Sequence, residues 1–125
     1  MNENDTLVIC DLKNSYRQQL SYYRALGEIG RKIMSRLVLS RGDFGAIKAD
    51  LFEKKRILAC IEDERIRTAP QVNRWQEYKR RMVLSDDARE FDAILQETET
   101  VIRDFLDGED QLKKYIESLI RKTAA

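Results

Sequence analysis

Apolar side chains recur every three or four positions through the first third of the chain. This spacing places them on one face of an α-helix, because each helical turn takes about 3.6 residues. It predicts a first long helix over residues 11–39. Gly27 and Gly30 lie beside the apolar face and indicate either a close approach of another helix or a weak bend. The apolar positions are Leu12, Tyr16, Leu20, Tyr23, Leu26, Ile29, Ile33 and Leu37.

A second helix is predicted over residues 43–67. Residues 40–42 interrupt the first pattern, and the Asp43 carboxylate can accept a hydrogen bond from the free amides of the next first turn. Lys54 falls on the apolar face of this helix. Its ammonium either reaches water at the edge of the seam or pairs with an acidic side chain of a neighbouring helix. The apolar positions are Phe44, Ile47, Leu51, Leu58 and Ile61.

Pro70 is expected to end the second helix, because proline lacks an amide hydrogen and disfavours helical geometry in the residue before it. Residues 70–84 are rich in arginine and lysine and are predicted to form a short helix or an arm. Ser85, followed by two acids, should then cap a third long helix over residues 86–121. The apolar pattern keeps its phase across the Asp-Gly pair at 107–108, so one bent but continuous helix is expected there.

These patterns predict an all-α protein. The expected architecture is an elongated antiparallel bundle of three long amphipathic helices, with the short helix or arm between the second and the third. A single helical domain should span residues 1–125, because a chain of this length buries only one sizeable core. The composition agrees, since 36% charged residues, 42% hydrophobic residues and one proline are typical of long helices in water.

Charge is distributed unevenly, although the net charge is only +1. Residues 1–43 carry seven basic and five acidic side chains, residues 44–84 carry ten and six, and residues 85–125 carry six and eleven. A nucleic-acid-binding protein usually has a dominant basic surface, which the acidic last third would neutralise here. The pattern therefore favours oppositely charged helices lying side by side and predicts no nucleic-acid partner.

Catalytic and metal-binding chemistry is not expected. The chain has no histidine, which is the commonest general base and metal ligand, and Cys10 and Cys60 stand too far apart for a zinc site. The G-D-F-G segment at residues 42–45 lacks the spacing of a phosphate-binding loop. The sequence predicts a protein that is not an enzyme and that uses no cofactor and no metal.

The sequence also predicts a cytoplasmic protein that does not insert into membranes. No stretch approaches the roughly 20 consecutive apolar residues that cross a bilayer. The first residues lack the basic and apolar regions of a secretion signal. In a reducing compartment the two cysteines are expected to be free thiols.

The apolar face of the third helix is wider than contact with one neighbour requires, because it is built largely from adjacent apolar pairs. One part should face the protein's own helices. The rest is predicted to bind an amphipathic helix of a protein partner, or else to be internal core or a homodimer seam. If it faces a partner, polar replacements there should leave folding nearly intact. The predicted partner-binding residues are Val101, Ile102, Phe105, Leu112, Tyr115, Ile116 and Leu119.

The segment SRGDFGAIKADLFEKKRILACIEDE, residues 40–64, resembles the FlgN-type flagellar export chaperones. In that family an acid and an apolar residue open a helix, and a leucine is followed by a lysine and further apolar positions. The long helices before this segment and after the mid-chain tryptophan fit the same layout. The last helix departs from it, because DGEDQLKKYI stands where the family often has asparagine and small polar residues. The matching positions are Asp43, Phe44, Ile47, Leu51, Lys54 or Lys55, Leu58 and Ile61.

The resemblance implies a cytoplasmic chaperone that holds the helical C-terminal segments of hook-associated proteins before their export. The alternative is a structural coiled-coil adaptor or dimerisation module. In that case all the apolar faces would be covered by the protein itself or by its own copy, and no large apolar groove would stay exposed.

Overall fold

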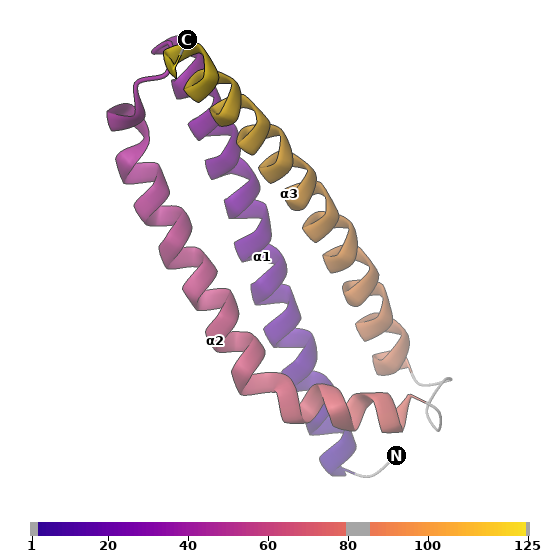
Figure 1. The fold of residues 1–125 in the computed structure, drawn as a ribbon. Coiled ribbons are helices and arrows are strands. Elements are labelled where there is room, and N and C mark those ends of the chain that lie inside the picture. Colours follow the sequence, from indigo (N-terminus) through magenta and orange to yellow (C-terminus); the bar gives the residue numbers. More distant parts are fainter. Residues whose placement is uncertain (1–2, 80–85, 125) are drawn as a thin grey trace.

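The computed structural model describes residues 3–79 and 86–124, and these segments are almost entirely helical (Figure 1). No strand occurs within them, so the predicted all-α class is confirmed. The predicted cap at Ser85 lies outside the described residues. The elements are helix α1 over Glu3–Leu39, the short 3-10 helix η1 over Phe44–Ile47, helix α2 over Lys48–Tyr78 and helix α3 over Asp86–Ala124.

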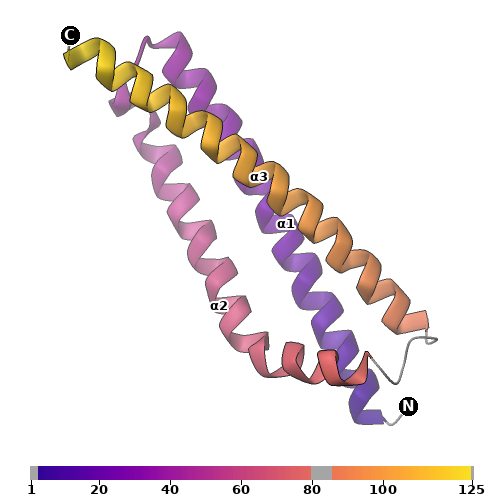
Figure 2. The ribbon, with the colours of Figure 1, turned by 45° about the vertical axis from the view of Figure 1, so that its right-hand side comes forward.

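Helix α1 packs against both α2 and α3 (Figure 1). The chain reverses between α1 and α2 and again between α2 and α3, so helices that follow each other run in opposite directions. Both views show α2 apart from α3 over most of its length and turning towards the beginning of α3 in its last third (Figures 1 and 2), and no Cα atoms of these two helices come within 8 Å of each other in the described residues. Helices α2 and α3 therefore both pack on α1 and contact each other only through side chains.

The reversal between α1 and α2 contains two residues with a left-handed backbone. Arg41 has a φ of 58° and Gly42 a φ of 91°, a conformation that glycine adopts without steric cost. The Gly42 amide donates to the Leu37 carbonyl at 2.9 Å and closes the end of α1. The Asp43 carboxylate accepts from the Gly45 amide at 3.0 Å. The predicted cap is confirmed, although it caps η1 rather than the α-helix that follows.

The core consists of two clusters. The turn-end cluster lies near the reversal between α1 and α2, and the far-end cluster lies near the beginning of α1. The turn-end cluster contains Leu26, Ile29, Ile33, Leu37, Ile47, Ile57, Ile61 and Leu112. The far-end cluster contains Val8, Ile9, Leu12, Trp75, Ala88 and Phe91.

The far-end cluster explains why α1 begins earlier than predicted. The sequence pattern placed its start near residue 11, but the helix begins at Glu3. Val8 and Ile9 are buried in the far-end cluster, together with Trp75 of α2. Packing against the other helices thus stabilises the beginning of α1, although the polar sequence of its first turn does not predict a helix.

Helix α2 does not end before Pro70 as predicted but continues through it to Tyr78. Proline removes one backbone hydrogen bond and bends a helix without always breaking it. The figures show α2 changing direction in its last third (Figures 1 and 2). Trp75 lies beyond the proline and is buried in the far-end cluster, so tertiary packing stabilises the continued helix. The predicted separate short helix or arm is wrong for residues 70–79, and residues 80–84 lie outside the described segments.

The buried face of α2 also differs from the predicted one. Phe44, Leu51 and Leu58 are exposed, whereas Ile57 is buried between the predicted seam residues Ile47 and Ile61. The reason is that α2 buries only the face that meets α1. The predicted stripe mixed this face with the adjacent one, which is turned towards α3.

Basic side chains of α1 pair with acidic side chains of α3, whereas the charge pattern predicted that the basic middle of the chain would lie beside the acidic last third. The Lys13 ammonium of α1 is buried and binds the Asp87 carboxylate at 2.9 Å and the Glu90 carboxylate at 3.1 Å. The hydrogen bond from Asp87 raises the pKa of Lys13, whereas burial works in the opposite direction. Farther along the same seam, Arg24 of α1 pairs with Glu97 of α3. These contacts fix the register of α3 on α1 more than they add stability.

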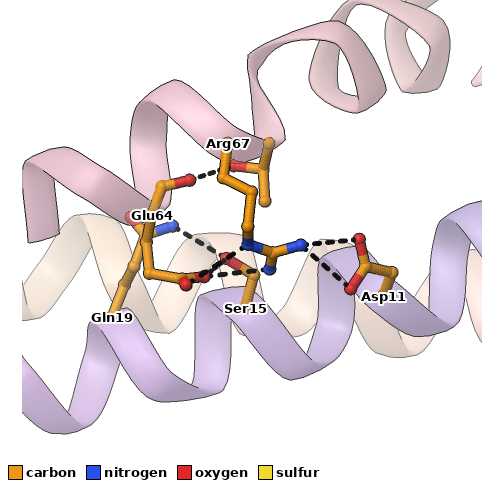
Figure 3. Close-up of polar contacts among 6 residues, drawn as sticks. Asp11, Ser15, Gln19, Glu64 and Arg67 are labelled. Carbon is orange, nitrogen blue, oxygen red and sulfur yellow. Dashed lines mark hydrogen bonds and ion pairs between the residues drawn. The ribbon is translucent and has the colours of Figure 1, made fainter. Parts of the chain in front are cut away.

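Between α1 and the middle of α2 the seam is polar (Figure 3). The buried Ser15 hydroxyl donates to the Glu64 carboxylate at 2.7 Å, and the buried Gln19 amide donates to the Ser15 oxygen at 3.3 Å. Arg67 joins the two helices by donating to Glu64 at 3.0 Å and to Asp11 at 3.3 Å. Hydrogen bonds therefore replace apolar contacts over this part of the interface.

We expect this polar seam to weaken in acid. Hydrogen bonds from Arg67 and Ser15 hold the pKa of Glu64 below its usual value. A carboxyl group whose pKa falls on folding stabilises the protein above the pKa of the unfolded chain, about 4.3, and this contribution is lost as the pH falls through the lower pKa of the folded state. The free energy of unfolding in urea should therefore decrease as the pH is lowered from neutrality to about 3.

The variant Glu64→Gln should show a smaller decrease, because it has no carboxyl group to protonate at this position. Part of the decrease should remain, since Lys13 lowers the pKa of Glu90 in the same way. An identical pH dependence in the parent and in Glu64→Gln would contradict the assignment.

Candidate partner-binding site

Acidic and cysteine side chains form no metal site in the described part of the chain. No group of three or more of them is placed to hold a metal ion there. Cys10 and Cys60 are half-buried free thiols. Across residues 3–79 and 86–124, every helix falls short of the apolar length that crossing a bilayer requires. The surfaces between helices carry the predicted partner-binding residues.

Four of the seven predicted partner-binding residues belong to the turn-end cluster or pack against it. Leu112 is a member of the cluster and is only 5% exposed. Phe105, Tyr115 and Ile116 are half-buried and contact its members. The expectation that a polar side chain at Leu112 leaves folding intact does not fit this burial.

The other three predicted residues are half-buried. The Leu119 side chain lies against the reversal, with both Cδ atoms 3.3 Å from the place where a Cβ atom on Gly42 would be. Val101 borders a cavity between α1 and α3. Ile102 follows it on the helix and is turned about 100° farther round the axis. The apolar face predicted on the third helix therefore contacts more than one neighbouring segment.

A groove of about 440 Å³, the α2–α3 groove, lies between the beginning of α2 and the last third of α3. Its apolar walls come from Leu51 of α2 and from Leu112 and Ile116 of α3. It thus contains two of the predicted residues, together with Leu51. The charged residues that line it are Lys54, Glu109, Asp110, Lys113 and Glu117.

An ion pair crosses the α2–α3 groove. The Lys54 ammonium binds the Glu109 carboxylate at 2.5 Å, and the two side chains are 15% and 30% exposed. Of the two alternatives open for Lys54, the pair with a neighbouring helix is therefore the one adopted. Replacing Lys54 with an apolar residue therefore breaks a charge pair.

We expect Lys54→Met to lower the free energy of unfolding by about 1–2 kcal/mol. Exposed pairs contribute at most about 1 kcal/mol, whereas breaking a fully buried pair costs about 3–5 kcal/mol, and this pair lies between these limits. Urea unfolding checks the value. Lys55→Met, the same change at the exposed neighbouring position, is the control and should have little effect. Equal stability of Lys54→Met and the parent would show that the pair contributes nothing.

The sequence analysis missed exposed apolar residues that share a helix side with residues lining the α2–α3 groove. Leu106 and Ile120 lie seven positions before and after Lys113, so all three share one side of α3. Both are exposed, and so is Leu58, two turns beyond Leu51 on α2. The signal was present, because Leu106 and Ile120 are the second members of adjacent apolar pairs.

A second hollow, the α1–α3 cavity, has a volume of about 460 Å³. Gly27 and Gly30 of α1 and Gly108 of α3 line it, with Tyr23 and Phe105, whose ring centroids are 6.0 Å apart. A Cβ atom added at Gly30 or Gly108 would meet no atom within 4 Å. Of the two alternatives left open for these glycines, a close helix approach does not apply to Gly30, which borders open space.

Known proteins give no guide to either hollow. Comparisons of the chain with protein-family models, with curated proteins and with solved structures found no match. The assignment of a function therefore rests on the geometry of the two hollows and on the residues around them.

Proposed function

We propose that this chain is an export-chaperone-like protein that holds an amphipathic helix of a protein partner in the α2–α3 groove. One observation carries the proposal: apolar side chains of α2 and α3 stay exposed in the groove and on the side of α3 that carries Lys113 of its rim. Leu51 on α2 is 45% exposed and Leu106 on α3 is 58% exposed. In a closed bundle such side chains are buried, and a contiguous exposed apolar surface is typical of a binding site.

The spacing of the helices supports an added helix. Packed helices have axes about 8–10 Å apart, whereas α2 and α3 have no Cα atoms within 8 Å of each other in the described residues. A helix laid along the groove, over the Lys54–Glu109 ion pair, would contact both and complete a four-helix bundle. Such a partner needs apolar residues at positions i, i+3 or i+4, and i+7.

The charges at the groove support an amphipathic partner. Lys113 is exposed on its rim, and so are Asp110 and Glu117. A partner helix with an apolar face flanked by charges of both signs would match this rim. Such complementarity favours correct orientation and faster association more than affinity.

The resemblance of residues 40–64 to FlgN-type chaperones indicates which partner to test first. It is a C-terminal helical segment of a hook-associated flagellar subunit, held in the cytoplasm before export. The second candidate function is a structural adaptor or dimerisation module. Phe52 and Leu39 favour it, because they are exposed outside the α2–α3 groove, where a second copy could cover them.

The test is fluorescence anisotropy with a labelled peptide from the C-terminal helix of a hook-associated subunit. We expect Leu51→Glu and Leu106→Glu to raise the dissociation constant at least tenfold, about 1.4 kcal/mol. Their unfolding curves should stay close to that of the parent. Ile66→Glu is the matched control, since Ile66 is exposed on α2 but does not line the groove, and it should bind normally.

Sedimentation of the free protein separates the two candidates. A monomer whose peptide binding is lost in both groove variants supports the chaperone function. A dimer that dissociates on Phe52→Glu supports the dimerisation module instead, because Phe52 is exposed outside the groove. Unchanged peptide binding in both groove variants would exclude the α2–α3 groove as the site.

A further inference from the structure

The α1–α3 cavity opens between a different pair of helices from the α2–α3 groove and is independent of the proposed function. Its volume of about 460 Å³ falls in the range of about 300–1,000 Å³ that is usual for small-molecule sites. Aromatic and aliphatic side chains from both helices form its interior. They are Tyr23, Leu26, Met34, Val101 and Phe105.

The glycines around the cavity keep it open. Apart from proline, glycine is the poorest helix former, so its presence inside two helices calls for a physical reason. Close packing is not that reason at Gly30 and Gly108, where an added Cβ atom would meet nothing within 4 Å. At Gly27 the nearest atom, 3.7 Å away, belongs to the flexible Arg31 side chain. Side chains at these positions would project into space that the protein leaves empty.

The ion pairs between α1 and α3 stop at the cavity. These ion pairs repeat every seven residues along both helices. The next pair of the series would join Arg31 of α1 to Asp104 of α3, and both residues line the cavity. Neither has an ion-pair or hydrogen-bond partner among the described residues, and the same holds for Glu28 on the rim. Two carboxylates and one guanidinium at the mouth of the α1–α3 cavity are thus available to bind a ligand. The pairs before it are Arg17 with Glu90 and Arg24 with Glu97.

We propose that the α1–α3 cavity binds a small organic cation with an apolar body, of the arylalkylammonium class. The apolar body fits among Tyr23, Met34 and Phe105. The excess of carboxylates places the ammonium beside Asp104 and Glu28.

The test is a titration of the ¹⁵N-labelled full chain, followed through its backbone amide signals. Three probes share one body and differ in the end group: 4-phenylbutylammonium, 4-phenylbutanol and 4-phenylbutyrate. We expect the cation to shift the signals of Gly27, Gly30 and Gly108. Its dissociation constant should be at least fivefold lower than those of the alcohol and the carboxylate.

Two variants locate the site. Gly108→Leu fills the cavity and should abolish the shifts at Gly27 and Gly30, whereas Ala93→Leu adds the same side chain at an exposed position of α3 and should bind normally. Asp104→Asn changes only a surface charge and should reduce the preference for the cation, which keeps the test valid if Gly108→Leu does not fold. Absent shifts, equal binding of all three probes, or undiminished binding by a folded Gly108→Leu would each overturn the proposal.

Discussion

Replacing Phe91 with alanine should lower the free energy of unfolding by about 3–5 kcal/mol, the range found for buried phenylalanines. Phe91 is 1% exposed. Its ring meets those of Tyr16 and Trp75 edge-on, with centroids 5.4 and 4.9 Å apart. These three rings come from three different helices, so the loss of the central one leaves a cavity that the others cannot fill without moving their helices.

The matched control is Phe52→Ala, because Phe52 is 73% exposed on α2. It should change the free energy of unfolding by no more than about 0.5 kcal/mol. Urea unfolding can follow the fluorescence of Trp75, the only tryptophan, and circular dichroism at the same time. Equal losses in the two variants would contradict the placement of Phe91 at the contact of the three helices.

A second large effect is expected on α3. Leu112→Ala should lower the free energy of unfolding by about 2–5 kcal/mol, whereas Leu106→Ala should lower it by less than about 0.5 kcal/mol. The substitution is the same in both cases, but Leu112 is 5% exposed in the turn-end cluster and Leu106 is 58% exposed. The difference therefore measures burial and not helix propensity.

Thermal and urea unfolding of both variants check this expectation. It also decides how the partner site can be studied. Loss of binding in a Leu112 variant would be ambiguous, because the fold itself is weakened, whereas Leu106 can be changed without that effect. If Leu106→Ala proves as destabilising as Leu112→Ala, then α3 is covered on the side that we assign to the partner.

The sequence predicted the first and third helices well, because one apolar face dominates each of them. Leu12, Leu26, Ile33 and Leu37 are buried as their spacing indicated. The continuity of α3 past Gly108 was also predicted, since the apolar pattern keeps its phase there.

The second helix was predicted less well, because the face that it buries is polar in its middle, between the buried Ile61 and Trp75. Glu64 and Thr68 are residue types that usually lie at the surface, yet here they lie on the seam with α1. Pro70 was predicted to end the helix because proline lacks an amide hydrogen. The packing of Trp75 in the far-end cluster keeps the residues beyond it helical. Both errors have the same cause, namely contacts with α1 that no local pattern contains.

The candidate site was predicted only in outline. Adjacent apolar pairs on α3 showed that the helix faces two neighbours, but a pair such as Phe105 and Leu106 does not show which member is buried. The angles at which α1, α2 and α3 pack decide which member is buried, and these angles depend on the whole fold. The α1–α3 cavity was not predicted either, since glycine is equally compatible with close packing and with empty space.

The short reversal between α1 and α2 bears on the order of folding. It joins these helices through residues 40–43, whereas the ion pairs that hold α3 on α1 connect residues 73–77 positions apart. Closing a longer loop costs more entropy, and contacts between distant residues form more slowly. We therefore expect α1 and α2 to form a hairpin first and α3 to dock last. During synthesis, the face of α1 that α3 covers stays open to solvent until the final third of the chain has left the ribosome.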